Sequence, residues 1–136
     1  MFRVTTEPLS VQQVNDLVKS PTDGAVVTFD GIVRNNFDGR PVRYLEYEAY
    51  AAMAEKKLAE IGAEVQQKFA VGKIAMIHRI GHLEIGESSI VIAVAASHRY
   101  AAFEAYAYAM DRVKAEVPVW KKEFFADGAD HWVNQN

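Results

Sequence analysis

The sequence contains no cysteine and only four prolines in 136 residues. Without cysteine, the chain cannot form disulfide bonds, hold a metal through thiolates or use a cysteine nucleophile. No apolar run approaches the roughly 20 residues that cross a bilayer, and the first residues lack the basic-then-apolar pattern of a secretory signal. These absences predict a cytoplasmic protein that does not enter a membrane.

The chain also lacks an excess of charge of one sign. Its 15 Lys and Arg residues are interleaved with 18 Asp and Glu residues, and the net charge is -3. This balance gives no electrostatic case for nucleic acid or an anionic membrane, so any anion site must be local. Half of the residues are hydrophobic, which is enough for a core. We therefore predict a single domain over residues 1–136.

Three segments have the spacing of amphipathic helices. Ser10 with Gln13 and the apolar residues after them predict a short capped helix that ends before Pro21. Residues 51–69 and about 97–117 predict two long helices, the second N-capped by Ser97 and ended by Pro118. The side chains expected on their buried faces are Met53, Leu58, Ile61, Val65 and Phe69 in the first, and Phe103, Tyr106, Met110, Val113 and Val117 in the second.

Segments rich in β-branched and aromatic residues fill most of the remainder. Residues 25–33 and 42–50 flank the polar loop 35–39 and are expected to pair as a hairpin. Residues 73–80 and 88–96 predict two more strands joined by a tight connection at 82–87, and residues 119–125 predict a last strand. This order predicts an α+β fold in which two long helices pack on a largely antiparallel sheet.

Two positions could bind an anion. His98 and Arg99 follow Ser97 at the start of the last predicted helix, where free backbone N–H groups and the helix dipole favour negative charge. Arg34 opens the polar loop after the first β-rich segment, and loops on rigid scaffolds often carry binding groups. The pattern alone leaves two other readings open, in which the arginines are solvated surface residues and His98 is a packing histidine.

Two lysines could carry chemistry. Lys114 lies one turn beyond Met110 and flanks the predicted apolar stripe, so we expect it to be partly desolvated, and Lys121 follows after the proline. Burial and neighbouring cations favour the neutral amine of a lysine, which can act as a nucleophile or a general acid–base. The alternative is that the stem covers apolar surface while the ammonium stays in water. The spacing of the remaining histidines predicts no metal ion and no cofactor.

Several separated segments resemble one known family in wording and order. They are residues 23–29 (DGAVVTF), 31–35 (GIVRN), 77–81 (IHRIG), 97–99 (SHR), 102–105 (AFEA), 110–111 (MD), 114 (K) and 118–123 (PVWKKE). Over residues 22–132 the chain is similar to the large, catalytic subunit of molybdopterin synthase, the MoaE family. An ordered set of segments is far more specific than a single motif.

The resemblance implies an α/β-hammerhead-like α+β fold and a homodimer with a small ubiquitin-like sulfur-carrier subunit at each end. In that family, the carrier's C-terminal glycine thiocarboxylate enters a pocket of the large subunit. It donates sulfur to cyclic pyranopterin monophosphate in two rounds, which forms the dithiolene of molybdopterin. The absence of cysteine fits this chemistry, because the sulfur arrives on the partner.

The resemblance also implies roles for individual residues. Lys114 matches the central catalytic lysine, and Lys121 matches the lysine that supports it. Positions that line the substrate pocket in the family match Arg34, His98, Arg99 and Met110. An alternative is a non-catalytic pterin- or phosphate-binding adaptor on the same scaffold, which would not need Lys114. Family members often continue with basic residues beyond the position of Asn136, so the resemblance carries no anion contact from such a tail to this chain.

The length of the last predicted helix separates the candidate residues. Lys114 follows Arg99 by fifteen residues, which is about 22 Å along a helix. Two side chains would shorten this gap by only about 10 Å, at roughly 5 Å each, so one compact pocket cannot hold both. We therefore expect a composite site at a two-fold homodimer interface, with Lys114 and Lys121 from one chain and His98 and Arg99 from the other.

Overall fold

The computed structural model describes residues 1–134. Helices and strands alternate along the chain. In order they are β1 (Phe2–Thr5), α1 (Val11–Val18), β2 (Ala25–Ile32), β3 (Asn36–Phe37), β4 (Arg40–Ala49), α2 (Ala51–Lys68), β5 (Ile74–Arg79), β6 (Gly81–Glu84), β7 (Ser88–Ala96), α3 (Arg99–Glu116), β8 (Val119–Phe125) and β9 (Asp130–Asn134).

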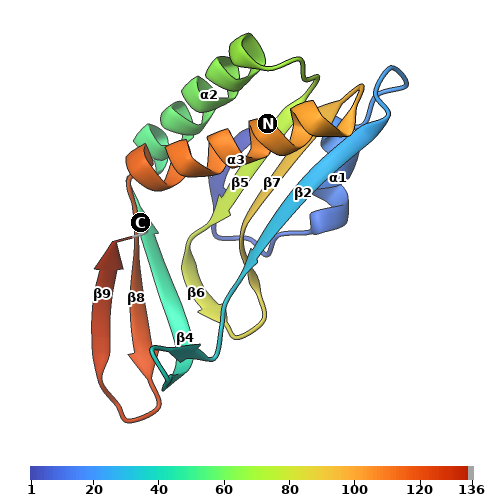
Figure 1. Cartoon of the computed structure of the whole chain (residues 1–136). Helices are drawn as coiled ribbons and strands as arrows, with labels where there is room; N and C mark the ends of the chain where they lie inside the picture. Colours follow the sequence, from blue (N-terminus) through green and yellow to red (C-terminus); the bar gives the residue numbers. More distant parts are fainter. Residues whose placement is uncertain (135–136) are drawn as a thin grey trace.

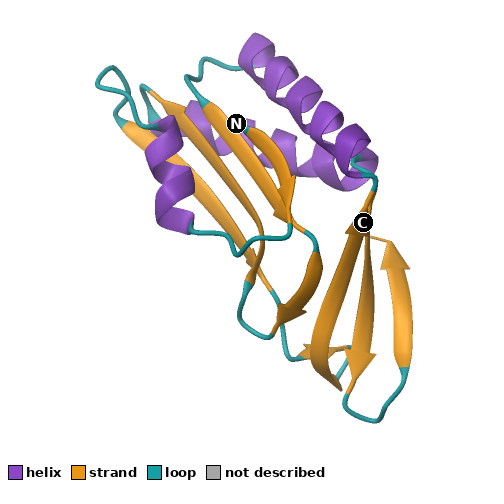
Figure 2. Ribbon diagram, turned by 180° about the vertical axis from the view of Figure 1, so that it is seen from behind, coloured by secondary structure: helices purple, strands orange, loops and turns teal. Residues whose placement is uncertain are grey.

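The strands form two sheets (Figure 1). The first has the order β1-β5-β7-β2, in which only the β1–β5 pair is parallel. The second has the order β3-β4-β8-β9, and β6 pairs with the edge of β4 that faces away from β8. The long helices α2 and α3 lie on one face of the first sheet, and α1 lies on the other (Figures 1 and 2). The α+β class and the largely antiparallel pairing are confirmed, but the strands form two sheets where the sequence predicted one.

The predicted hairpin of residues 25–33 with 42–50 is wrong. β2 pairs with β7 in the first sheet, whereas β4 pairs with β6 and β8 in the second. The polar loop between them contains β3, which turns into β4 through Asp38 and Gly39, both at positive φ. The connection predicted at 82–87 also contains part of a strand, β6. Alternation along a segment predicts a strand but does not identify its partner.

Helix α3 ends where the sequence predicted, and most of its predicted buried face is confirmed, since Met110, Val113 and Val117 are buried and Tyr106 is partly buried against the core. The backbone N–H of Val117 caps the helix by donating to Val113, directly before Pro118. Its N-cap is His98, one residue after the predicted Ser97, and the His98 side chain makes no capping hydrogen bond. The predicted burial of Phe103 is wrong, since this side chain is 52% exposed. Alanines, whose small side chains let the helix approach the sheet closely, make up the rest of the buried face, namely Ala102, Ala105 and Ala109.

Helix α2 packs as predicted along most of its length. Leu58, Ile61 and Val65 are buried, whereas the predicted burial of Met53 is wrong, since it is 57% exposed at the start of the helix. Gly62 is also buried, because the ring of Phe2 lies against it and a Cβ there would come within 2.2 Å of that ring. This contact docks β1, a short edge strand that the sequence did not predict.

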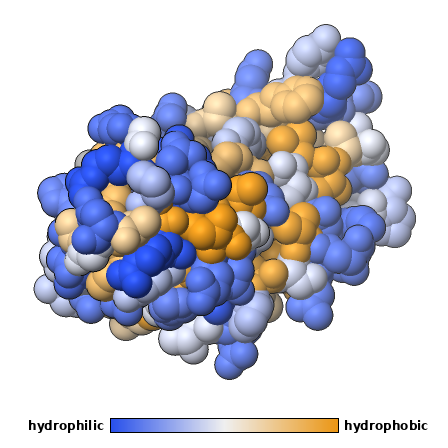
Figure 3. Space-filling model, turned by 90° about the horizontal axis from the view of Figure 1, so that it is seen from below, coloured by the Kyte–Doolittle hydropathy of each residue, from blue (hydrophilic) through white to orange (hydrophobic). Residues whose placement is uncertain are grey.

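One hydrophobic core joins both sheets to the long helices. It includes Leu45 and Phe125 from the second sheet, Ile92 from the first, Leu58 from α2 and Val113 from α3. On the surface, apolar side chains gather in the middle of the face seen from below, bordered by hydrophilic residues (Figure 3). Among the described residues, no helix combines the length and apolar character that crossing a membrane requires.

Candidate functional site

A narrow cavity lies where the chain leaves β2 and meets the second sheet. Its volume is about 60 Å³. Its walls include the apolar side chains of Val33, Phe37 and Leu45. Five polar residues also line it, namely Arg34, Asn36, Tyr47, Lys121 and Glu123. The fold therefore brings together Arg34 and Lys121, two predicted site residues that are far apart in the sequence.

Strand pairing explains why these side chains meet. β4 and β8 are antiparallel, with Tyr47 opposite Lys121 and Leu45 opposite Glu123. Because side chains alternate between the faces of a strand, Lys121 and Glu123 emerge on the same face of β8, next to Tyr47. The same face carries the buried residues Val119 and Phe125. The side chains of Lys121 and Glu123 therefore point toward the interior and not into solvent.

Lys121 lies in a perturbed electrostatic environment. Its side chain is partly buried, and this burial is the main cause that lowers its pKa. The positive charges of Arg34 and Lys114 lower the pKa further, and the carboxylate of Glu123 opposes them. Cations from α3 and from the loop after β2 thus act on Lys121 of β8.

Lys114 differs from the prediction. It is exposed in the last turn of α3, where a cation interacts favourably with the helix dipole, and it is not partly desolvated within the single chain. The expected desolvation occurs at Lys121. The sequence placed Lys114 beside a stripe of large apolar residues, but α3 buries its alanine face, which turns Lys114 toward solvent.

Two further polar residues of the cavity were not predicted. Glu123 is 2% exposed, and none of the described residues donates a hydrogen bond to its Oε1 atom. Tyr47 is also buried, and this burial is the main cause that raises its pKa. A hydrogen bond with the Ser89 side chain lowers the pKa of Tyr47, and the negative charge of Glu123 raises it. The alternation Lys121, Glu123, Phe125 within β8 was the available signal, since it puts the glutamate on the face of a buried phenylalanine.

His98 and Arg99 lie at the opposite end of α3 from Lys114. Both are exposed, and the Arg99 guanidinium stacks over the Tyr100 ring at 4.5 Å and donates to the Tyr100 hydroxyl at 3.1 Å. Because α3 is continuous from Arg99 to Glu116, the fold does not bring these residues to the cavity of their own chain. Met110 is buried in the core, one turn before Lys114. Gln135 and Asn136 lie outside the described residues.

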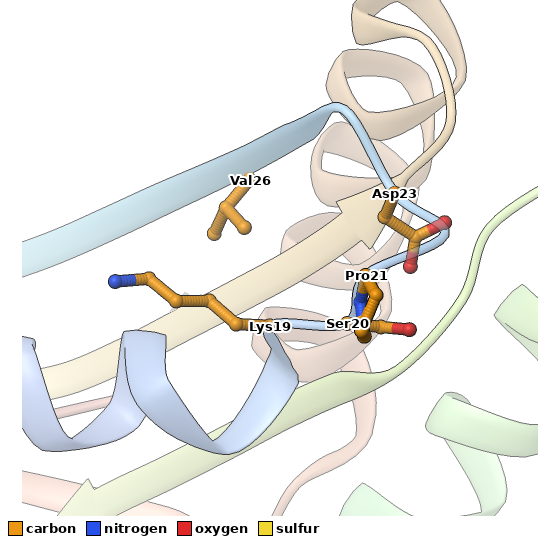
Figure 4. A pocket seen from close by; sticks show the side chains of 5 residues that line it. All are labelled: Lys19, Ser20, Pro21, Asp23 and Val26. Carbon is orange, nitrogen blue, oxygen red and sulfur yellow. The ribbon is translucent and has the colours of Figure 1, made fainter.

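Two larger hollows lie elsewhere on the surface, and neither is lined by a predicted site residue. One of about 350 Å³ lies beside the loop after α1 and is lined by Lys19, Ser20, Pro21, Asp23 and Val26 (Figure 4). The side chains of Lys19 and Asp23 do not converge in it (Figure 4), and Lys19 pairs with Asp16 at 3.2 Å on the surface. Within residues 1–134, no three His, Asp or Glu side chains cluster as metal ligands would.

Comparison with known proteins points in one direction. A family model described as "MoaE protein" matches residues 4–116. The chain is 48% identical over 132 residues to the molybdopterin synthase catalytic subunit of Halalkalibacterium halodurans, covering 97% of this chain and 84% of that protein. It is also 48% identical over 129 residues to the subunit of the same name from Homo sapiens, covering 95% of this chain and 69% of that one.

A solved structure, that of molybdopterin synthase from Staphylococcus aureus, has the same fold. It superposes with a TM-score of 0.92 and 42% sequence identity, over 97% of this chain and 96% of that one. The segment matched by the family model contains every predicted site residue except Lys121, which follows it on β8. The shared fold thus covers both ends of α3 and the cavity.

Proposed function

This chain belongs to the MoaE protein family, and on that premise we propose that it transfers sulfur from the C-terminal thiocarboxylate of a small carrier subunit to cyclic pyranopterin monophosphate. Its relatives are named catalytic subunits of molybdopterin synthase, and the chain is accordingly an enzyme of molybdenum cofactor biosynthesis. The observation that carries the finer proposal is that Arg34 and Lys121 line one narrow cavity and that the charge of Lys114 also acts on Lys121. The proposal includes a single domain and the cytoplasmic location expected from the sequence.

The surroundings of each cation suggest its role. The guanidinium of Arg34 can neutralise the substrate phosphate or the carboxylate that the carrier releases in each round. Lys121 has a lowered pKa, so more of it is neutral near pH 7 than for an ordinary lysine, and it can accept a proton during the transfer. Lys114 is exposed and close enough to Lys121 for their charges to interact, so it can hold or protonate an intermediate that forms beside Lys121.

The site we propose is completed by a second copy of the chain. His98 and Arg99 would serve the pocket of the partner protomer, because about 22 Å of helix separates them from Lys114 of their own chain. The exposed face of α3 supports this arrangement. It carries Tyr100 (65% exposed) and Phe103 (52% exposed), followed by Ala107, which is also exposed.

Ala107 would lie at the crossing point of the two helices. If two copies of α3 pack antiparallel across a two-fold axis at this residue, position 99 of one chain faces position 115 of the other, since 99 and 115 are each eight residues from 107. The small alanine side chain allows the two backbones to approach closely. Arg99 would then lie beside the partner's last helical turn, which contains Lys114.

Complementation between two inactive variants tests the composite site. Lys114→Ala and Arg99→Ala are each prepared, mixed under dissociating conditions and reassociated. Random association makes about half of the dimers mixed, and each mixed dimer carries one site with both residues intact. We expect dithiolene product, formed from thiocarboxylated carrier and the cyclic pterin phosphate, to return at about a quarter of the wild-type rate.

Two results would count against the proposal. If mixed dimers form and no activity returns, the two residues do not act across the interface. If the wild-type protein binds the cyclic pterin phosphate but forms no product with a thiocarboxylated carrier, the chain is a binding adaptor and Lys114 has no catalytic role.

A further inference from the structure

Glu123 has a buried carboxylate oxygen that the described chain leaves without a hydrogen bond. The side chain is 2% exposed and lines the cavity, and its Oε1 has no donor among residues 1–134. A buried acceptor without a partner costs free energy, and native structures contain few of them. A group that enters the cavity and carries an N–H donor would remove this cost.

The size of the cavity limits what this group can be. About 60 Å³ corresponds to roughly two water molecules of the liquid and is far below the roughly 300 Å³ at which small-molecule pockets begin. A pterin ring does not fit, whereas a narrow, extended peptide end does. Val33, Phe37 and Leu45 form apolar walls, and in so small a volume a last residue without a side chain fits best.

The spacing of the charged groups on β8 matches such a peptide end. Lys121 and Glu123 are two positions apart on one strand face, which separates their Cα atoms by about 6.6 Å. In the last residue of a peptide, the amide N–H and the carboxyl group flank a single Cα. An acceptor and a cation at this spacing can therefore bind the N–H and the carboxyl group of the same residue.

We propose that Glu123 accepts the amide N–H of the last residue of the carrier tail while Lys121 faces its terminal carboxyl group, and that the two together select glycine at this position. The inference rests on the proposed function, which supplies the carrier. Glu123 thereby sets how far the tail enters the cavity, and the thiocarboxylate carbon is held beside Lys121. The carboxylate acts by hydrogen bonding, and no bond is made or broken at Glu123.

The test removes the donor from the ligand and leaves the enzyme unchanged. A semisynthetic carrier in its carboxylate form receives an ester in place of its last amide, which deletes one N–H and keeps the chain length and the terminal charge. Its affinity for the full-length wild-type protein is measured by calorimetry against the all-amide carrier. A hydrogen bond to a charged acceptor predicts a loss of about 10-fold or more. A carrier ending in alanine should also bind at least about 10-fold more weakly.

The same amide-to-ester comparison is then made with variants of the enzyme, which gives a double-mutant cycle between Glu123 and the tail amide. In Glu123→Gln, replacing the amide by the ester should weaken carrier binding by less than about 3-fold, because the charged acceptor is gone. Glu48→Gln is the matched control, since Glu48 is exposed on the opposite face of β4, and it should keep the full ester effect. Glu123→Gln should bind the cyclic pterin phosphate alone within about 2-fold of wild type.

Sulfur transfer by the wild-type protein, measured in parallel with the native thiocarboxylated carrier, separates the two hypotheses. If product forms and the ester carrier binds as tightly as the amide carrier, the role of Glu123 is overturned and the proposed function stands. A loss of pterin affinity in Glu123→Gln without an ester effect also overturns it, because the unpaired oxygen would then serve the pterin. If no product forms and no carrier binds, the proposed function fails, and this inference fails with it.

Discussion

Lys114 and Lys121 are close enough for their charges to interact, yet their surroundings differ. Lys114 is exposed at the end of α3, whereas Lys121 is partly buried on β8 with a lowered pKa. A lysine in solvent contributes little packing, and a buried cation costs desolvation free energy. The two residues should therefore respond differently to substitution.

Lys114→Ala should abolish sulfur transfer and change the free energy of unfolding by no more than about 0.5 kcal/mol, because an exposed side chain is removed. Lys114→Arg should fail too, since a guanidinium stays protonated and cannot exchange a proton. Product formation and urea unfolding are the measurements. Lys56→Ala, an exposed lysine of α2, is the control and should keep full activity. Near-normal turnover in either Lys114 variant would exclude Lys114 from the mechanism.

Lys121→Met should be inactive but at least as stable as the wild type at pH 7. Because burial lowers the pKa of Lys121 in the folded state, the unfolded chain binds more protons between that lowered pKa and the ordinary lysine value of about 10.4. The wild type therefore gains stability from this group as pH rises through that window, and the full desolvation cost applies below it.

Urea unfolding across this pH range checks the prediction. The increase in the free energy of unfolding with pH should be smaller in Lys121→Met than in the wild type. In Lys56→Met, which replaces an exposed lysine, it should be the same as in the wild type. A Lys121→Met protein that is clearly less stable at pH 7 would mean that the attraction between Lys121 and Glu123 outweighs the desolvation of the lysine.

At the scale of an element, α3 has two separate faces. Alanines face the sheet, and Tyr100 and Phe103 face solvent in the single chain. Large apolar side chains at the surface of one protomer are typical of a site that another protein covers. The proposed two-fold contact uses this face.

Phe103→Asp should give folded monomers that do not transfer sulfur, because a charge within the proposed contact, one turn from its crossing point, opposes association. Light scattering measures the mass, and circular dichroism confirms the fold. Leu17→Asp is the matched control: Leu17 is 40% exposed on α1, which lies on the other face of the first sheet, and this variant should stay dimeric. A dimeric, active Phe103→Asp protein would show that the dimer interface does not include this face of α3.

At the scale of the whole molecule, the two sheets share one core. Phe125 and Leu45 of the second sheet belong to the same buried cluster as Ile92 of the first sheet and Leu58 of α2. A continuous core couples the stability of its parts, so one sheet should not unfold without the other.

Two spectroscopic probes can test this coupling. Both tryptophans, Trp120 and Trp132, lie in the second sheet, whereas the long helices that dominate circular dichroism pack on the first. Urea unfolding followed by the two signals at one protein concentration should give coincident transitions. Phe125→Leu should lower both midpoints together, at a cost of about 1–3 kcal/mol. Separate transitions would show that the chain unfolds as two units.

Local sequence signals determined much of the fold and most of the candidate site. Helix spacing, Pro118 and alternation specified the long helices, most of the strands and the α+β class, because these depend on neighbours within a few residues. The ordered segments that resemble the MoaE family predicted Lys114, Lys121 and Arg34 as site residues. The helix length by itself separated Arg99 from Lys114, since the rise per residue is fixed.

Only the tertiary structure decided which strands pair, which face of α3 is buried and which lysine is desolvated. β2 pairs with β7 and not with β4, and this long-range choice divides the strands into two sheets. Phe103 is exposed because alanines allow α3 to approach the sheet more closely than a ring would. The cavity and its unpaired Glu123 oxygen arise where the loop after β2 meets β4 and β8. Burial depends on what the rest of the chain places around a residue, and spacing along the sequence carries no record of that.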